Sequence, residues 1–163
     1  METYKIIVGF ENYSVSDYGN VKNNRTGRIL KPNYRKDGYM GISLVKEKNK
    51  STQIIHRLVA KAFIPNPDGK PCVDHINNNR NINHIDNLRW VSPFENQHNR
   101  TINKNSTSMV KGVDFHNNKW RAQITIDGIR IHLGYFDNLE DAKQARIIKA
   151  NEAFGVFVNK CEK

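Results

Sequence analysis

Four polar residues between positions 74 and 96 combine side-chain types that suit hydrolysis of a phosphodiester. Asp74 and His75 are adjacent, and Asn87 and Asn96 follow after an Asn-rich loop at 77–81. A carboxylate and an amide oxygen can hold a hard divalent cation, and an imidazole beside them can act as a general base. The set therefore indicates metal-assisted hydrolysis. The alternative is an Asp-His pair that arose by chance, followed by a turn residue and a solvated helix position.

A strand, a loop, a second strand and a helix must position these side chains. The second strand is the short apolar segment 88–91, and the signals for the start of a helix follow at once. Ser92 suits the N-cap, Pro93 suits the first helical position, and Glu95 can close a capping box on Ser92. Asn96 then lies one turn into the helix, after two strands that carry the other polar residues.

This segment resembles the ββα-metal motif of the HNH homing endonucleases, in the Asp-His version found in phage and intron-encoded members. The resemblance implies that Asp74 and Asn96 are metal ligands, that His75 is the general base, and that Asn87 orients the imidazole. It also implies one Mg²⁺ or Mn²⁺ per active site, with open positions for phosphate oxygens and water. His98 is either a further ligand, a phosphate contact or a solvated histidine on the helix.

The composition is consistent with a polyanionic partner. The chain has 163 residues, a formal net charge of +10 and a sequence pI near 9.7. Such an excess favours binding of DNA or RNA, although solubility alone also explains a basic surface. No apolar run is long enough to span a membrane, no signal peptide is evident, and there are only two cysteines. We therefore expect no membrane partner and an intracellular protein, in the cytoplasm of a bacterial or phage-infected cell.

Residues 1–53 form a first, β-rich module in which short β-forming segments alternate with turn signals. The segment 13–22 (YSVSDYGNVK) resembles the nuclease-associated modular domain that precedes HNH cores. Basic residues cluster in its turns and edges, and they are either solvated or in contact with the DNA backbone. The candidate DNA contacts in this module are Arg25, Arg28, Lys31, Arg35 and Lys36.

Residues 54–100 form the expected nuclease core. A short amphipathic helix is predicted over 56–63, and the prolines at 65 and 67 end it. His56 is expected to cap or pack this helix, and Arg89 could pair with Asp86 instead of contacting DNA. The candidate phosphate contacts in this core are Arg57, Arg80, Arg89 and Arg100.

Residues 101–110 are polar and are expected to form a linker, which leads to a third module at 111–158. Apolar and polar residues alternate over 120–126, Asp127-Gly128 is a hairpin signal, and the segment 130–136 is the returning strand. A helix should then be capped by Asp137, with Glu140 closing the box, and end at Gly155.

The third module resembles the AP2 DNA-binding domain, which has a three-stranded antiparallel sheet backed by one helix. The resemblance implies that the polar face of the sheet contacts the major groove. Asp114 stands where the family usually has an arginine, so the sequence preference cannot be transferred. Trp120, Tyr135 and Phe136 are expected in the core under the helix. The positions expected to face DNA are Lys111, Arg121, Gln123, Thr125, Arg130 and His132.

The sequence thus predicts an α+β protein with a small β-rich module, a ββα-metal core, and a three-stranded sheet with one helix. The resemblance implies a site-specific endonuclease acting on double-stranded DNA, as a monomer on its target. Two alternatives stay open: a catalytically inactive, AP2-like DNA-binding regulator, and a basic RNA-binding or structural protein, which would explain the charge but not the motif.

Overall fold

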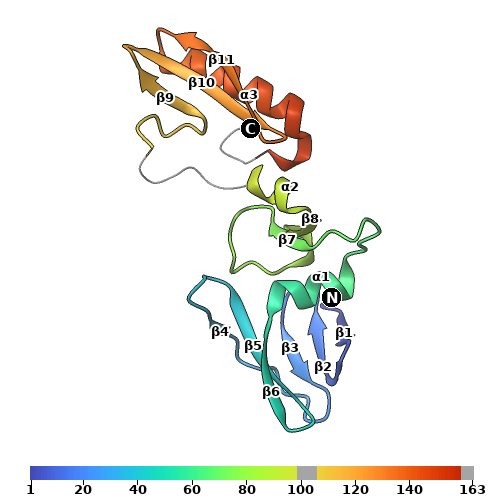
Figure 1. The fold of residues 1–163 in the computed structure, drawn as a ribbon. Coiled ribbons are helices and arrows are strands. Elements are labelled where there is room, and N and C mark those ends of the chain that lie inside the picture. The colour runs from blue at the N-terminus through green and yellow to red at the C-terminus, as the bar shows by residue number, and fades with distance from the viewer. Residues whose placement is uncertain (99–105, 159–163) are drawn as a thin grey trace. The chain divides into compact units, whose positions relative to one another are not determined.

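The fold is described from a computed structural model, which covers residues 1–98 and 106–158. Arg100 and the side chain of His98 therefore lie outside the described residues. The chain divides into two compact units, Met1–Ser92 and Pro93–Lys163, which are treated separately. The predicted α+β class is confirmed, since the described residues form several small sheets and three α-helices (Figure 1). None of the described helices is long and apolar enough to cross a membrane.

The first unit begins with two three-stranded antiparallel sheets, β1-β2-β3 and β4-β5-β6. The predicted alternation of short strands and turns is present, with turns at Gly9 between β1 and β2 and at Asp37-Gly38 between β4 and β5. The strands are β1 (Tyr4–Ile7), β2 (Phe10–Ser16), β3 (Val21–Asn23), β4 (Asn33–Tyr34), β5 (Met40–Lys46) and β6 (Asn49–Ile54).

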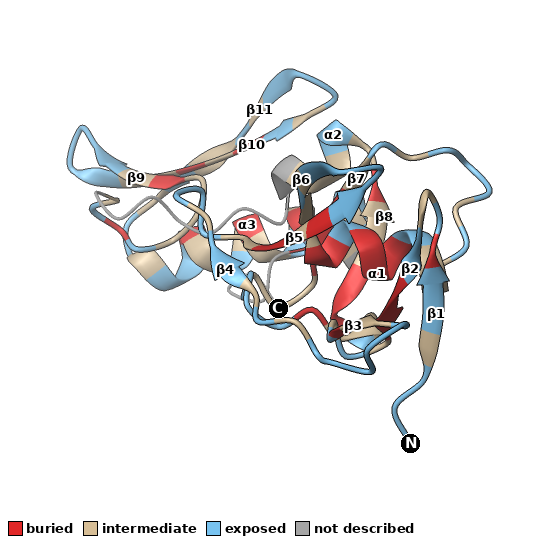
Figure 2. Cartoon of the chain, turned by 90° about the horizontal axis from the view of Figure 1, so that it is seen from below, coloured by how far each residue is buried: buried red, intermediate tan, exposed pale blue. Residues whose placement is uncertain are grey.

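Helix α1 (Ile55–Phe63) forms the centre of the first unit, and its predicted position is confirmed within one residue. Leu58, Val59 and Ala60 are buried among apolar residues of the surrounding strands, since one face of the helix is apolar. Figure 2 shows the buried residues concentrated on α1 and on strands packed around it. Two further strands, β7 (Cys72–His75) and β8 (Leu88–Val91), pair antiparallel beside this core.

The second unit contains α2 (Pro93–His98), a three-stranded antiparallel sheet and the long helix α3 (Leu139–Phe154). The sheet has the order β11-β10-β9, formed by β9 (Val113–His116), β10 (Lys119–Ile126) and β11 (Ile129–Phe136). The predicted hairpin between β10 and β11 is therefore present, with positive φ angles at Asp127 and Gly128.

Two predictions for the second unit are wrong. The N-cap of α3 is Asn138, whose side chain accepts a hydrogen bond from the Asp141 amide, so Asp137 is not the cap and Glu140 does not close a box on it. Tyr135 is 49% exposed, although it was expected in the core. The register of β10 and β11 shifts between Ala122 and Gln123, and this bulge reverses the alternation of the residues that follow on β11.

Candidate active site

The strand pair β7–β8 positions the central residues of the site. Asp74 lies directly opposite Arg89, and His75 lies opposite Leu88. Asp74 and His75 are 7% and 4% exposed, although both are polar. Buried polar groups of this kind need partners, so their contacts define what they can do.

Asp74 forms a close ion pair with Arg89. Both Nε and Nη2 of the guanidinium donate to the same carboxylate oxygen, Oδ2, at 3.0 and 2.9 Å. The predicted alternative, a pair between Arg89 and Asp86, is wrong, because Asp86 instead contacts His84 at 3.3 Å. Arg89 therefore fixes one oxygen of the carboxylate and compensates its negative charge inside the unit.

His75 is held by an asparagine that the sequence analysis did not single out. Its Nε2 lies 3.2 Å from Oδ1 of Asn83, which is 5% exposed. The amide nitrogen of Asn83 donates to the carbonyl of Asn81 at 3.4 Å, so its oxygen is the atom that faces the imidazole. A carbonyl oxygen only accepts, so Nε2 carries the proton. Nδ1 of the neutral ring then has the lone pair that a general base needs.

The side-chain amide of Asn87 makes its hydrogen bonds to the backbone of the loop and not to the imidazole. Its Oδ1 accepts a hydrogen bond from the Asn77 amide at 3.0 Å, and its Nδ2 donates to the Ile82 carbonyl at 2.8 Å. Its backbone carbonyl also accepts from the Ile76 amide at 2.9 Å. Asn87 thus crosslinks the Asn-rich loop, and its carbonyl also bonds the backbone at Ile76, beside His75.

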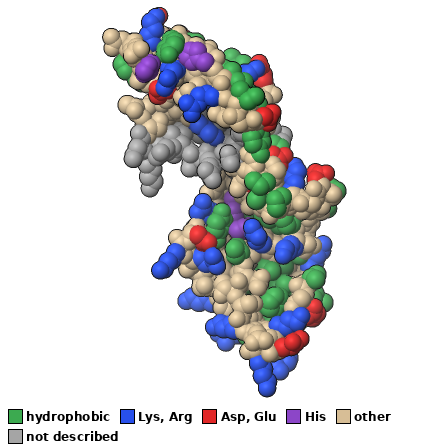
Figure 3. Space-filling model, viewed as in Figure 1, with side chains coloured by type: hydrophobic (Ala, Val, Ile, Leu, Met, Phe, Trp, Pro, Cys, Tyr) green, Lys and Arg blue, Asp and Glu red, His purple; other side chains and the backbone are tan. Residues whose placement is uncertain are grey.

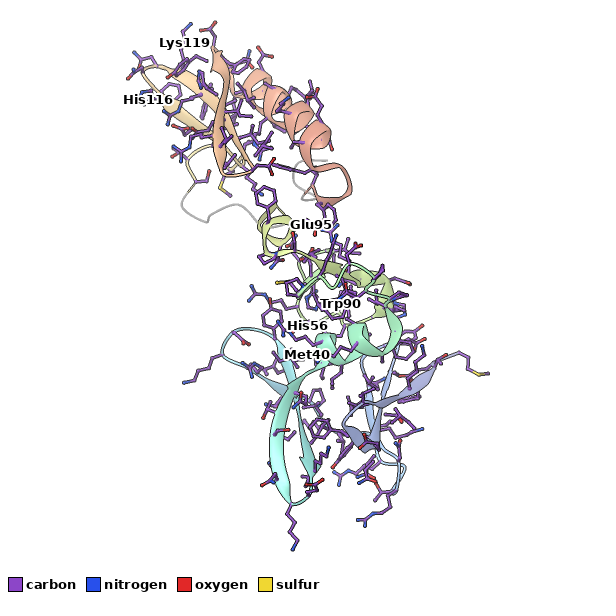
Figure 4. The ribbon with its side chains drawn as sticks, turned by 45° about the vertical axis from the view of Figure 1, so that its right-hand side comes forward. Met40, His56, Trp90, Glu95, His116 and Lys119 are labelled. Carbon is purple, nitrogen blue, oxygen red and sulfur yellow. The ribbon has the colours of Figure 1, made fainter. Side chains whose placement is uncertain are left out.

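A cluster of rings encloses the other side of His75. His56 of α1 lies 4.9 Å from the His75 ring and 4.7 Å from the ring of Tyr39, measured between centroids. The expected packing role of His56 agrees with its burial, and α1 is capped at Ile54. Figure 4 labels His56 and also Met40, whose sulfur lies 3.3 Å from the Asn83 amide nitrogen. Neither Tyr39 nor Asn83 has a pattern in the sequence that could have identified it.

The electrostatics of the two histidines follow from burial. Burial is the largest cause that lowers the pKa of His75, while the Asn83 hydrogen bond and the Asp74 charge oppose it. Burial lowers the pKa of His56 to about 3, and the neighbouring His75 and Arg57 act in the same direction. Nδ1 of His56 is buried and has no hydrogen-bond partner among the described residues. Both rings are therefore neutral at pH 7.

Acidification from pH 7 to about pH 5 is expected to lower the free energy of unfolding by about 2 kcal/mol through His56 alone. The folded ring has a pKa of about 3 against 6.5 in a solvated histidine, so the unfolded state binds more protons between these values. Asp37 opposes this effect, whereas His75, Arg57 and Arg80 reinforce it. Urea unfolding of the wild type and of His56→Phe at both pH values measures the difference. An equal pH dependence in both proteins would contradict the assignment.

The predicted cations of the first unit differ in their surroundings. Arg35 is paired with Asp37 at 2.9 Å, and Arg80 lies over the Tyr39 ring while donating to the Asp37 carbonyl at 2.6 Å. Arg35 and Arg80 are thus each held by a contact with Asp37. The cations that are exposed are Arg25, Arg28, Lys31, Lys36 and Arg57.

The second unit holds Asn96, on α2, and the predicted polar face of the sheet. Cross-strand pairing places Arg121 opposite Tyr135, Gln123 opposite His132, and Thr125 opposite Arg130. These side chains share one face of the sheet, as expected from the alternation. Lys111 precedes β9, and Figure 4 labels His116 and Lys119, which are partners at the β9–β10 turn.

Arg121 lies on the polar face of the sheet in an ion pair with Asp114. Its Nε and Nη2 donate to the two oxygens of Asp114 at 3.2 and 2.7 Å. This fork holds the guanidinium in one orientation on the polar face, and the paired carboxylate raises its pKa. The residue that departs from the AP2 pattern, Asp114, therefore has a structural partner on the neighbouring strand.

Comparison with known proteins agrees with this geometry. Residues 2–45 match the NUMOD4 motif. The chain is 37% identical over 131 residues to the DNA endonuclease I-HmuI of Bacillus phage SP01. The aligned region covers 77% of this chain and 74% of that protein. The chain is 40% identical over 110 residues to the uncharacterized HNH endonuclease L245 of Acanthamoeba polyphaga mimivirus, which covers 66% of this chain. That match spans only 33% of the mimivirus protein, so this chain corresponds to about a third of its length.

A solved structure shows the same similarity in three dimensions. The structure described as DNA binding and cleavage by the HNH homing endonuclease I-HmuI matches with a TM-score of 0.57 and 31% identity, over 94% of this chain and 83% of that one. The chain belongs to the HNH homing endonuclease family. The predicted resemblance of the HNH core is confirmed by these relatives, and that of the first module by its motif match. The AP2-like character of the second unit stays a prediction.

Proposed function

We propose that the protein is a site-specific DNA endonuclease that hydrolyses a phosphodiester with His75 as general base. The observation that carries this proposal is the buried Asp74–His75 pair. Asn83 accepts a hydrogen bond from Nε2 of the imidazole, so Nδ1 is the basic nitrogen. The family membership supports the same reaction, since its named members include DNA endonucleases. An inactive regulator would not need to keep a buried neutral base beside a buried carboxylate.

The residues fit a divalent cation by the chemistry of their donors. The carboxylate of Asp74 and the amide oxygen proposed for Asn96 are hard oxygen ligands, which suit Mg²⁺ or Mn²⁺. Among the described residues no group of three or more His, Cys, Asp and Glu side chains is arranged to hold a metal. Two protein ligands, with water and phosphate oxygens, make a common Mg²⁺ set.

Each residue of the site then has a separate task. Nδ1 of His75 removes the proton from the attacking water, and Asn83 keeps that nitrogen unprotonated until then. Arg89 holds one oxygen of Asp74, so that the carboxylate keeps a single orientation. When bound, the divalent ion would supply charge stabilisation at the phosphate and the leaving oxygen. Asn87 keeps the loop in shape, and the product ends proposed from the family are 5′-phosphate and 3′-hydroxyl.

The proposed substrate is double-stranded DNA, bound through both units by a monomer. Figure 3 shows Lys and Arg side chains spread over the first unit, where they suit phosphate contacts. In the second unit, the polar face of the β9–β11 sheet is proposed to contact the duplex. The residues proposed for that contact are Lys111, Arg121, Gln123, Thr125, Arg130 and His132.

Cleavage of a library of supercoiled plasmids with random inserts, in Mg²⁺ or Mn²⁺, tests the function. We expect nicked or linear DNA whose ends, read by sequencing, share one recognition sequence. His75→Ala serves as the control for contaminating nucleases. Retention of intact plasmid by the wild type in every divalent ion, together with tight DNA binding, would favour the inactive regulator. Preferential binding of RNA over duplex DNA would favour the third alternative.

Binding to duplex DNA is expected to weaken about 10³-fold between roughly 50 and 200 mM salt, as six or more phosphate contacts require. Arg28→Gln should reduce the salt slope by about one, because Arg28 is exposed and basic. Lys143→Gln is the matched control, because Lys143 is paired with Glu140 on α3. Fluorescence anisotropy with a labelled duplex measures both slopes. A salt-independent affinity would contradict the proposed phosphate contacts.

A further inference from the structure

A turn of the N-terminal module is packed against the loop that carries Asn83. Gly19 in this turn has a φ of +87°, and a Cβ added there would lie 2.9 Å from Cβ of Asn83 and 3.2 Å from Cγ2 of Ile55. Real Cβ atoms essentially never come as close as 2.9 Å to another carbon. The absence of a side chain at Gly19 therefore allows the backbone of the turn to approach Asn83.

The contact extends over three consecutive residues on each side. The amide of Ile85 donates to the carbonyl of Asp17 at 2.9 Å, and the rings of Tyr18 and His84 meet edge to face at 4.3 Å. Residues 17–19 of the turn thus contact residues 83–85 of the loop. The two segments are more than 60 residues apart in the chain, so only the fold of this unit brings them together.

The turn itself is rigidly built. Ser16 is fully buried, and its Oγ accepts hydrogen bonds from the amides of Asn20 and Tyr18 at 2.9 and 3.3 Å. Asp17 exchanges two hydrogen bonds with Thr3, one through its side chain and one through its backbone amide. These hydrogen bonds restrain the turn from both sides, so its position constrains the loop that it touches.

We propose that the turn 17–19 is a positioning device for the general base, acting through Asn83 on His75. The inference rests on the proposed function, in which His75 is that base. Asn83 selects the tautomer and the plane of the imidazole, and the turn sets the position of Asn83. Gly19 and Asn83 are therefore positioning residues. A displacement of about 1 Å at a reacting group can cost about 10²-fold in rate.

The first test compares two glycines of the same module. Gly9 has a φ of +82°, close to that of Gly19, but an added Cβ there would meet nothing within 4 Å. Gly9→Ala and Gly19→Ala therefore impose similar backbone strain, and only the second displaces Asn83. We expect Gly19→Ala to lower the single-turnover cleavage rate by about 10- to 100-fold. Gly9→Ala should change it by less than about twofold, with the dissociation constant for DNA unchanged in both.

A double-variant cycle shows whether Gly19 acts through Asn83. Asn83→Leu removes the acceptor oxygen while keeping the shape, and it should lower the rate by a similar factor. Asn83→Asp keeps an acceptor oxygen and should retain more of the rate. Gly19→Ala added to Asn83→Leu should then cause less than about a further twofold loss, because coupled residues are not additive.

A nitrogen NMR readout separates this inference from the proposed function. The ¹⁵N shifts of the His75 ring report which nitrogen carries the proton, whether or not the protein cleaves DNA. We expect the Nε2-H tautomer in the wild type and in Gly9→Ala, and a mixture in Gly19→Ala and Asn83→Leu. An unchanged tautomer in Gly19→Ala, or equal rate losses in the two glycine variants, would overturn the inference. A wild type with the expected tautomer and no cleavage would overturn the function alone.

Discussion

His75→Ala is expected to lower the cleavage rate by about 10²- to 10⁴-fold, the contribution of a positioned general base. The imidazole is 4% exposed, Asn83 orients it, and burial lowers its pKa below 6.5. It is therefore already neutral at pH 7 and ready to accept a proton. The loss should appear in the single-turnover rate and not in the affinity for DNA, because His75 is proposed to contact the attacking water.

The pH profile provides a second measure of the same residue. Since burial lowers the pKa of His75, the acid limb of the wild-type rate should have its half-maximal point below pH 6.5. His116→Ala is a matched control, since His116 is an exposed histidine at the β9–β10 turn of the second unit. An equal loss of rate in both variants, or an acid limb whose half-maximal point lies above pH 6.5, would contradict the role of His75.

Asp74→Ala is expected to abolish detectable cleavage and to weaken Mn²⁺ binding by more than about 100-fold. Loss of a side chain that only orients a metal ligand lowers metal affinity by about 10- to 100-fold, and loss of the ligand itself lowers it further. The same change should destabilise the fold by about 3 kcal/mol, because it removes the carboxylate that compensates the largely buried Arg89. Calorimetric titration with Mn²⁺ and urea unfolding measure the two effects independently.

Two further variants distinguish the effect of Asp74 on metal binding from its effect on the stability of the fold. Asp86→Ala removes a carboxylate whose side chain is 87% exposed, so it should leave both stability and Mn²⁺ affinity close to those of the wild type. Asp74→Asn keeps an oxygen acceptor for Arg89 but loses the charge, and it should recover part of the stability without recovering cleavage. Full cleavage and unchanged Mn²⁺ affinity in Asp74→Ala would show that Asp74 is not a metal ligand.

The local pattern of residues was enough to locate most elements and the proposed catalytic pair. The positions of α1, β8 and the β10–β11 hairpin follow from apolar spacing, prolines and a turn signal, all of which act within a few residues. Asp74 and His75 were identified for the same reason, since their types and their adjacency are visible in the chain itself.

The partners of these residues depended on the fold. Asn83 lies in a loop without periodicity, and Arg89 meets Asp74 only through the register of β7 and β8. Asn87 has the residue type expected for a site, yet its amide holds the loop instead of the imidazole. Such contacts join residues that are 5 to 15 positions apart, and no local pattern specifies them.

The chain therefore encodes the chemistry of the site locally, in residue types and in the spacing that makes strands and helices. The tertiary structure decides which groups meet: Gly19 against Asn83, Arg89 against Asp74, and Tyr135 outside the core after a bulge. The physical reason is that periodicity acts along a few residues. Hydrogen bonds, ion pairs and close approaches, in contrast, depend on strand register and on where the loops close.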